Sequence, residues 1–228
     1  MKSAVALSLK MPFPTNPEPL AVQKKMITLY QNIDHFFPDT PKRAIQFSAS
    51  RTGEGTTVVA REFANVARNS FDKSVLIIDA NPLHLDQCAF FDVSPKVTLL
   101  DVLRDTRIPL CDALYNVKKP DITISALARF ETTFHGTFNT KSTRNLFDRL
   151  KEQFDLIVID SAPVLSSAES VGLASGVDGI VLVMEAETTR WPVVEEAKNR
   201  ILGNDGNILG LVLNKRRYYT PEFLYKIL

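Results

Sequence analysis

The chain has 228 residues, of which 45% are apolar and 23% charged, and its formal net charge is +1. This length suffices for one large domain with a buried core, and the balanced charge excludes a whole-molecule field that would attract nucleic acid or acidic lipid. Two cysteines provide neither a disulfide framework nor a pair of metal ligands, and no stretch approaches the ~20 consecutive apolar residues of a membrane span. We therefore expect a soluble protein with reduced thiols.

The N-terminal residues 1–16 begin like a weak signal peptide, but their apolar run is too short for one. Because several prolines follow, we expect a flexible leader without regular structure. The sequence LAVQKKMITLYQNIDHFF then predicts a helix. We expect one domain over residues 17–217, followed by a tail or helix over 218–228.

Short apolar, β-branched runs predict the buried strands AIQFSAS (44–50), SVLIIDA (74–80), LIVIDSA (156–162), GIVLVMEA (179–186) and NILGLVLN (207–214). Helical periodicity lies between them in TTVVAREFANVARNSF and STRNLFDRLKEQF. Region 96–140 is less regular, with a short helix in VTLLDVLRD, a strand in DITISAL and a loop in RFETTFHGTFNTK. This alternation predicts an α/β fold with a doubly wound, mainly parallel sheet flanked by helices.

The segment FSASRTGEGTTVVAREF predicts a strand, a glycine-rich turn and a helix start, which together surround an anion with backbone N–H groups. Thr57 stands where a hydroxyl would bind magnesium, but Ser50 replaces the first glycine of G-x-x-x-x-G-K-[ST] and Thr56 replaces the lysine. The candidate nucleotide-binding residues of this loop are Arg51, Thr52, Gly53, Glu54, Gly55, Thr56 and Thr57. A tight glycine turn without a ligand would explain the two glycines as well, and this alternative stays open.

Two aspartates end predicted strands, Asp79 in SVLIIDA and Asp160 in LIVIDSA. Either one alone is explained as a helix cap. Two carboxylates at the carboxyl edge of parallel strands, beside a phosphate loop, favour a magnesium–nucleotide site instead. We predict Thr57, Asp79 and Asp160 as its metal ligands.

The blocks GEGTT, LIIDAN, FDLIVIDSAPVLSSAES, VDGIVLVMEAETTR and ILGLVLN together resemble the bacterial tyrosine kinases of the CpsD/CapB type. Those are P-loop proteins of capsule and exopolysaccharide synthesis, related to the MinD and ParA ATPases. The resemblance covers about residues 17–217. It implies ATP or ADP with Mg²⁺ as cofactor, magnesium-binding and catalytic roles for Asp79 and Asp160, and contact of Asn214 with adenine. It also implies a membrane polysaccharide co-polymerase as partner.

Departures from the family pattern affect the predicted chemistry. Thr56 replaces the lysine of the phosphate loop, and Asn81 and Leu83 replace the second aspartate and the arginine that follow the second strand. Thr56 cannot supply the lost charge, so nucleotide binding is expected to be weakened. Arg51 stands where MinD-type loops place a signature lysine, and either a cationic role or plain solvation is compatible with this position.

Other departures affect assembly and phosphorylation. The first helix of the family carries E-x-x-R-x-x-R, which builds a ring oligomer, and this chain has Lys24, Ile27 and Tyr30 there. The family tail carries a tyrosine cluster for autophosphorylation. The phosphoacceptor candidates here are Tyr218, Tyr219 and Tyr225.

These losses favour a degenerate tyrosine-kinase-like regulatory partner of an inner-membrane polysaccharide co-polymerase. An active protein-tyrosine autokinase that regulates polysaccharide chain length remains the alternative, and a MinD- or ParA-like positioning ATPase a minor one. Whether the chain is an enzyme stays open. We expect it in the cytoplasm, peripheral to the inner membrane through its partner, as a possible homo-oligomer without nucleic acid.

Overall fold

The structure is a computed structural model that describes residues 9–12, 19–81, 84–129 and 140–216. Within these ranges, eight strands form one sheet in the order β1-β8-β7-β2-β6-β3-β5-β4. The strands are β1 (Leu9–Pro12), β2 (Arg43–Ala49), β3 (Val75–Ala80), β4 (Tyr115–Val117), β5 (Ile122–Ala126), β6 (Leu156–Ser161), β7 (Gly179–Glu185) and β8 (Ile208–Arg216). All neighbours pair in parallel except β4 and β5, which are antiparallel.

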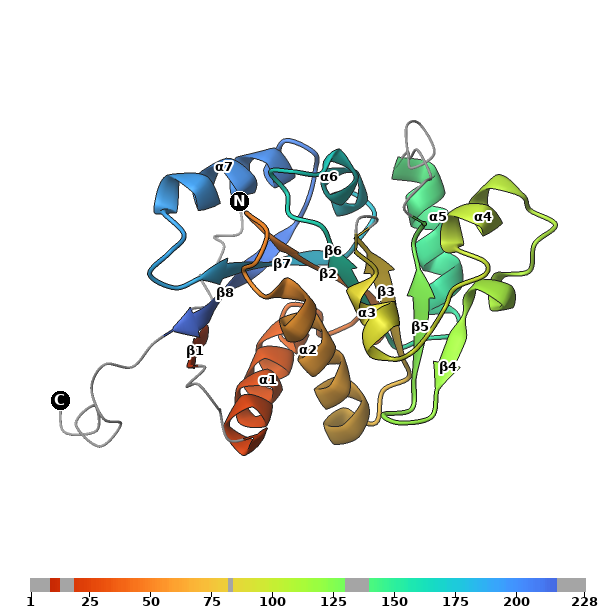
Figure 1. The fold of residues 1–228 in the computed structure, drawn as a ribbon, viewed down its shortest axis with the longest axis horizontal. Coiled ribbons are helices and arrows are strands. Elements are labelled where there is room, and N and C mark those ends of the chain that lie inside the picture. Colours follow the sequence, from red (N-terminus) through yellow and green to blue (C-terminus); the bar gives the residue numbers. More distant parts are fainter. Residues whose placement is uncertain (1–8, 13–18, 82–83, 130–139, 217–228) are drawn as a thin grey trace.

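Helices cover both faces of this sheet (Figure 1). Helices α1 and α2 lie on one face, and α5, α6 and α7 lie on the other, with the short α3 and α4 beside β3 and β5. The helices are α1 (Pro19–Asp34), α2 (Thr56–Phe71), α3 (Asp86–Phe90), α4 (Leu99–Arg104), α5 (Thr140–Lys151), α6 (Ala168–Ala174) and α7 (Trp191–Leu202), with a 3₁₀ turn at Leu110–Ala113. The predicted doubly wound α/β fold is confirmed.

The continuous apolar runs of the strands follow from this double coverage. Successive strand residues point to opposite faces, so a central strand needs apolar side chains at every position. In β3, Ile77 packs into the core beneath α1 and α2, whereas Leu76 and Ile78 pack into the core beneath α5. All six residues of β3 and all six of β6 are buried, which explains why both segments read as unbroken apolar runs.

The N-terminal region differs from the sequence-based expectation. Residues 1–16 are predicted to lack regular structure, but Leu9–Pro12 forms β1, which pairs in parallel with β8. That part of the prediction is wrong, because backbone pairing with an open sheet edge needs no apolar pattern in the added strand. The leader residues outside β1, the predicted loop over 130–139 and the tail over 218–228 lie outside the described residues.

Helix α1 is anchored by its apolar face. Tyr30 is only 4% exposed, and its ring stacks on Phe71 of α2 with the centroids 4.1 Å apart. Tyr30, at one of the positions where the family motif predicts arginine, therefore packs inside the chain. None of the helices in the described ranges combines the length and apolar character that a membrane crossing requires.

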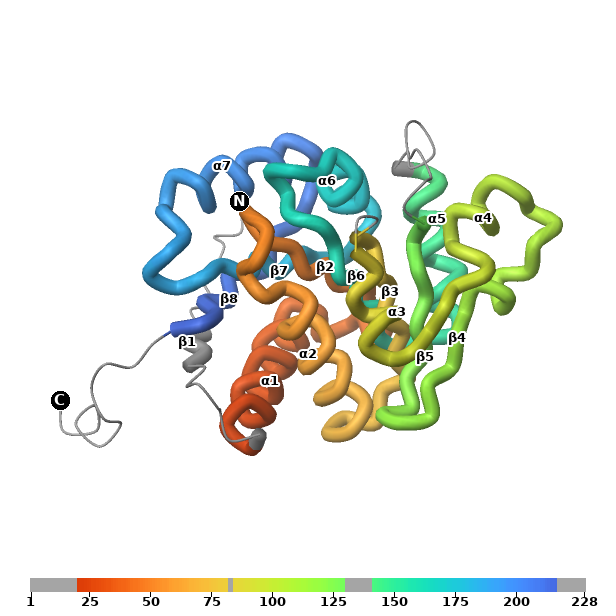
Figure 2. The backbone as a smooth tube through the Cα atoms, in the orientation of Figure 1, coloured from red at the N-terminus to blue at the C-terminus, as the bar shows by residue number. Residues whose placement is uncertain are grey.

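The topology brings distant segments of the chain to one edge of the sheet. Strand β2 lies between β7 and β6, and β6 pairs with β3, so that the ends of β2, β3 and β6 are neighbours (Figure 2). Strand β2 leads directly into the glycine-rich loop and α2. In such sheets, ligands bind outside the carboxyl ends of the strands at the point where the strand order reverses.

Candidate functional site

The glycine-rich loop connects β2 to α2 over residues 50–55. Gly53 and Gly55 have φ angles of 90° and 89°, in the left-handed region that glycine enters without steric cost. Gly55 precedes the first residue of α2, and no side chain caps that helix end. Among the hydrogen bonds of the described residues, none uses the backbone N–H of Gly53, Gly55 or Thr56 as a donor. The helix start therefore presents free donors and a positive dipole end, as an anion site requires.

Glu54 shapes this loop from inside. Its side chain is 3% exposed, and its Oε2 accepts hydrogen bonds from the backbone N–H groups of Ser50 at 2.7 Å and Arg51 at 3.0 Å. The hydroxyl of Thr189 donates to Oε1. The Glu54 carboxylate is thus occupied by the protein, and its effect on a ligand comes through the loop conformation.

Strand β8 approaches the loop from the other side. Asn214 is 2% exposed, and its Nδ2 donates to the Glu54 carbonyl oxygen at 2.9 Å. Lys215 donates from Nζ to the Gly53 carbonyl oxygen at 2.5 Å and pairs with Glu185 at 3.1 Å. These contacts fix the carbonyl side of the loop, whereas the N–H groups of Gly53 and Gly55 have no acceptor in the part of the chain that the structure describes.

The two predicted carboxylates meet as expected. Asp79 in β3 and Asp160 in β6 are directly paired in the register of the sheet and are 1% and 2% exposed. Asp79 Oδ2 accepts hydrogen bonds from the backbone N–H groups of Gln87 at 2.8 Å and Cys88 at 3.1 Å. Asp160 Oδ2 accepts from the Gln87 side-chain amide at 2.9 Å.

Burial weakens both acids, and at Asp79 the neighbouring carboxylate adds to its effect. Burial, reinforced by the neighbouring Asp160 charge, raises the pKa of Asp79 to about 7, although the N–H groups of Cys88 and Gln87 oppose the shift. Burial raises the pKa of Asp160 to about 6, against hydrogen bonds from Gln87 and Thr57 that favour its charged form. A pair of buried carboxylates with raised pKa values is stabilised by a nearby cation, which marks a functional-site candidate.

Gln87 is a residue of this site that the sequence analysis missed. It is fully buried, and its amide nitrogen bridges Asp160 Oδ2 and the Thr57 carbonyl oxygen at 2.9 and 2.8 Å. It thereby ties the start of α2 to the end of β6. The only sequence signal is a polar residue in the otherwise apolar run QCAFF after Asp86, and such a residue is more often exposed than buried.

Three buried polar atoms of this site have no hydrogen-bond partner among the described residues, namely Ser50 Oγ, Asp79 Oδ1 and Gln87 Oε1. An unsatisfied buried polar group costs about 1–3 kcal/mol, so such atoms indicate a water, an ion or another ligand. Carboxylate and hydroxyl oxygens are the donors that Mg²⁺ prefers. Thr57, Asp79 and Asp160 therefore fit a magnesium ion, although no cluster of three or more His, Cys, Asp or Glu exists in the described part of the chain.

The structure brings Asn214 into contact with the loop, and Gln87 joins Asp79 and Asp160 to the start of α2. Thr56 is 8% exposed, whereas the side chains of Arg51 and Thr52 are exposed. Leu83, Tyr218, Tyr219 and Tyr225 lie outside the described residues.

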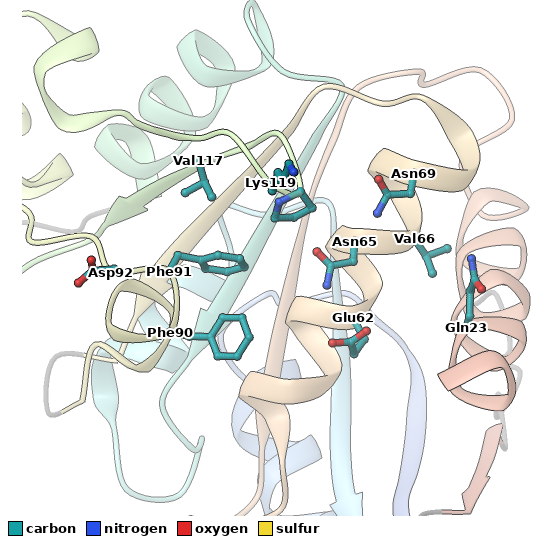
Figure 3. A pocket seen from close by; sticks show the side chains of 11 residues that line it. Gln23, Glu62, Asn65, Val66, Asn69, Phe90, Phe91, Asp92, Val117 and Lys119 are labelled. Atoms are coloured by element: carbon teal, nitrogen blue, oxygen red, sulfur yellow. The ribbon is translucent and has the colours of Figure 1, made fainter. Parts of the chain in front are cut away.

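A hollow of about 620 Å³ lies away from this site, between α1, α2 and the segments around α3 and β4 (Figure 3). Side chains of α2, including Asn65 and Asn69, face Phe90 and Phe91 across it. Neither the glycine-rich loop nor the paired aspartates line it. We therefore base the functional assignment on the loop and the carboxylates, whose chemistry is specific.

Comparison with known proteins agrees with this geometry, although no family model matches the chain. Over 180 residues it is 23% identical to the tyrosine-protein kinase CpsD of Streptococcus agalactiae, covering 78% of each chain. The kinase domain of the Escherichia coli tyrosine kinase ETK superposes with a TM-score of 0.78 at 20% identity, over 93% of this chain and 86% of that one.

Two further solved structures share the fold with lower TM-scores. A plasmid partition protein from Borrelia burgdorferi has a TM-score of 0.63 at 16% identity, covering 82% of this chain and 86% of that one. Cobyrinic acid a,c-diamide synthase from Mycobacterium smegmatis, solved with bound ADP and magnesium, has a TM-score of 0.61 at 16% identity, covering 75% and 72%. The resemblance of this chain to the CpsD/CapB-type bacterial tyrosine kinases, inferred from its sequence blocks, is confirmed.

Proposed function

We propose that this chain is a degenerate tyrosine-kinase-like protein that regulates the synthesis or export of an exopolysaccharide or capsule. It acts by contact with a membrane polysaccharide co-polymerase and binds nucleotide as a structural ligand, with little or no phosphoryl transfer. The observation that carries this proposal is Thr56, which stands at the first position of α2 where the loop needs its lysine. Two further features support the proposal: no side chain caps the start of α2, and the two carboxylates are adjacent at the ends of β3 and β6.

The missing charge has a calculable effect. A hydrogen bond to a charged group contributes about 1.5–3 kcal/mol, so losing the lysine weakens nucleotide binding about ten- to a hundredfold. Turnover suffers more than binding, because phosphoryl transfer depends on positioning and on stabilising the charge of the transferred group. The Thr56 hydroxyl donates one neutral hydrogen bond and cannot replace that stabilisation.

The proposed ligand is ATP or ADP with Mg²⁺. Thr57, Asp79 and Asp160 would hold the metal, whose charge would neutralise the phosphates. The free N–H groups at the start of α2 would bind the phosphate oxygens without help from the lysine. Bound ADP and magnesium in the structurally similar cobyrinic acid a,c-diamide synthase support this choice.

The proposed setting is the cytoplasmic side of the inner membrane, where a co-polymerase would hold the chain. This partner follows from the resemblance to the CpsD/CapB-type kinases. A homo-oligomer is compatible with the proposal, although Lys24, Ile27 and Tyr30 replace the motif that builds the family ring. We propose no nucleic-acid partner, because the net charge is only +1.

Two measurements test the proposal on purified full-length protein. We expect no transfer of γ-phosphate to its own tyrosines, and in calorimetric titrations with Mg·ATP we expect Thr56→Lys to bind about ten- to a hundredfold more tightly than wild type. Thr56→Met is the matched control, since it adds length without charge. The proposal is wrong if wild type phosphorylates itself and Asp160→Ala abolishes the reaction.

An active autokinase is the alternative that the retained carboxylates favour. Asp79 and Asp160 would then hold magnesium, and Arg51 or a partner residue would replace the lysine. Tyr218, Tyr219 and Tyr225 are the candidate acceptors. A mobility shift on phosphate-affinity gels that disappears in Asp160→Ala would favour this alternative, and tyrosines free of phosphate in polysaccharide-producing cells would count against it.

A further inference from the structure

The last strand of the sheet brings a lysine to the glycine-rich loop. Lys215 Nζ lies 2.5 Å from the carbonyl oxygen of Gly53, although 162 positions separate the two residues in the sequence. A Cβ atom added at Gly55 would lie 3.9 Å from Lys215 Cε. The loop that lacks its own lysine is thus in direct contact with a lysine from β8.

The backbone around Lys215 holds this position. Its φ angle of 55° is left-handed, a conformation that non-glycine residues rarely adopt. Its N–H donates to Asn214 Oδ1 at 2.9 Å, while Asn214 Nδ2 donates to the Glu54 carbonyl oxygen at 2.9 Å. Unusual backbone conformations of this kind persist where the surrounding contacts fix them, and they are concentrated at functional sites.

We propose that Lys215 supplies the cation of this loop and contacts the phosphate groups of a nucleoside di- or triphosphate bound there. An ammonium group has three donors, and the Gly53 carbonyl and the Glu185 carboxylate account for two of them. The third is available to an anion. The space beside Gly53 is open, because a Cβ atom added there would have no heavy atom within 4 Å. The inference rests on one part of the proposed function, that a nucleotide binds in the loop, and it does not depend on phosphoryl transfer.

Arg51 is the other cation near the loop, and the structure favours Lys215 over it. The Arg51 side chain is exposed, and no hydrogen bond or ion pair of that side chain with the loop exists among the described residues. Lys215 is already ordered by two contacts, so less conformational entropy is lost when it meets a ligand.

A substitution at Glu185 tests whether Lys215 binds the ligand or has only a structural role. Its carboxylate pairs with Lys215 and competes with any phosphate for the same ammonium group. If Lys215 binds the ligand, Glu185→Gln removes the competitor and tightens binding. If Lys215 only fastens β8 to the loop, the same substitution removes a fastening contact and leaves binding unchanged or weaker.

The experiment is calorimetric titration of the full-length protein with ADP and, separately, with inorganic pyrophosphate at low ionic strength. We expect Lys215→Met to weaken both affinities about ten- to a hundredfold, Lys215→Arg to keep most of the affinity, and Glu185→Gln to increase it about two- to fivefold. Adding Thr56→Lys to Lys215→Met should restore binding. Lys198→Met, at an exposed position within α7, is the matched control and should bind like wild type.

Two results would overturn the inference. One is equal affinity of Lys215→Met and wild type for both ligands, and the other is absence of binding by wild type. Thermal unfolding of each variant shows whether it is still folded. If Lys215→Met is unfolded, the affinities of Lys215→Arg and Glu185→Gln test the inference in its place. Detection of autophosphorylation would contradict the proposed function and leave the role of Lys215 intact, so the two proposals fail separately.

Discussion

Replacing Asp79 with asparagine is expected to increase the free energy of unfolding by about 2–4 kcal/mol at about pH 8, without added magnesium, and by little near pH 4. The pKa of the folded-state carboxyl is raised from 3.8 to about 7 by burial and by the Asp160 charge. Between these values the folded protein binds more protons than the unfolded chain, so wild-type stability falls as pH rises through this window. Asparagine keeps an oxygen that can accept from the Gln87 and Cys88 N–H groups and removes the buried charge.

The measurement is chemical denaturation of wild type and Asp79→Asn across this pH range. Asp39→Asn is the control, because Asp39 is exposed and precedes β2, at the opposite edge of the sheet from the site. A stability difference between wild type and Asp79→Asn that does not change with pH would contradict the prediction. Added Mg²⁺ should reduce the difference if the metal binds the two carboxylates, since it would stabilise wild type alone.

Alanine at Gly55 is expected to cost about 2–4 kcal/mol of stability, whereas alanine at Gly53 should cost only about 1–2 kcal/mol. Both glycines have φ near 90°, so the left-handed backbone penalises any side chain equally at the two positions. They differ in their surroundings. A Cβ atom at Gly55 would lie 2.2 Å from Asn214 Nδ2, and one at Gly53 would meet nothing within 4 Å.

The difference between the two variants therefore isolates the close approach of β8 to the loop. It can be measured by urea denaturation of Gly55→Ala, Gly53→Ala and wild type under one set of conditions. Gly55→Ala combined with Asn214→Ala should recover part of the loss, because the shorter side chain removes the clash. Equal stabilities of the two single variants would show that Asn214 moves aside without cost.

The fold could be predicted from the sequence because its main determinant is local. Apolar β-branched runs such as SVLIIDA can be buried on both faces only in the interior of a parallel sheet, and the helical periodicity between the runs provides the covering layers. The positions of Asp79 and Asp160 followed from the same pattern, since the carboxyl ends of adjacent parallel strands meet at one edge.

The rest of the site depends on contacts between distant segments, which no local pattern encodes. Gln87 joins Asp160 to α2 and Lys215 joins β8 to the loop, across 73 and 162 positions of sequence. Glu54 is predicted among the nucleotide-binding residues of the loop, and the structure adds that its carboxylate accepts hydrogen bonds from backbone N–H groups of the same loop. β1 was missed for a related reason, since its pairing is between backbones and leaves no trace in side-chain periodicity.

The two edge strands of the sheet also affect how readily the protein associates with other chains. The four-residue β1 covers the free edge of the nine-residue β8, and at the other margin the three-residue β4 covers β5. Pro12 has no N–H group, so β1 offers a poor template for a further strand. Short edge strands, and a proline in one of them, suppress the edge-to-edge pairing that leads to aggregation. Removal of residues 1–12 would expose β8, and the truncated protein should then aggregate at concentrations where the full chain stays dispersed.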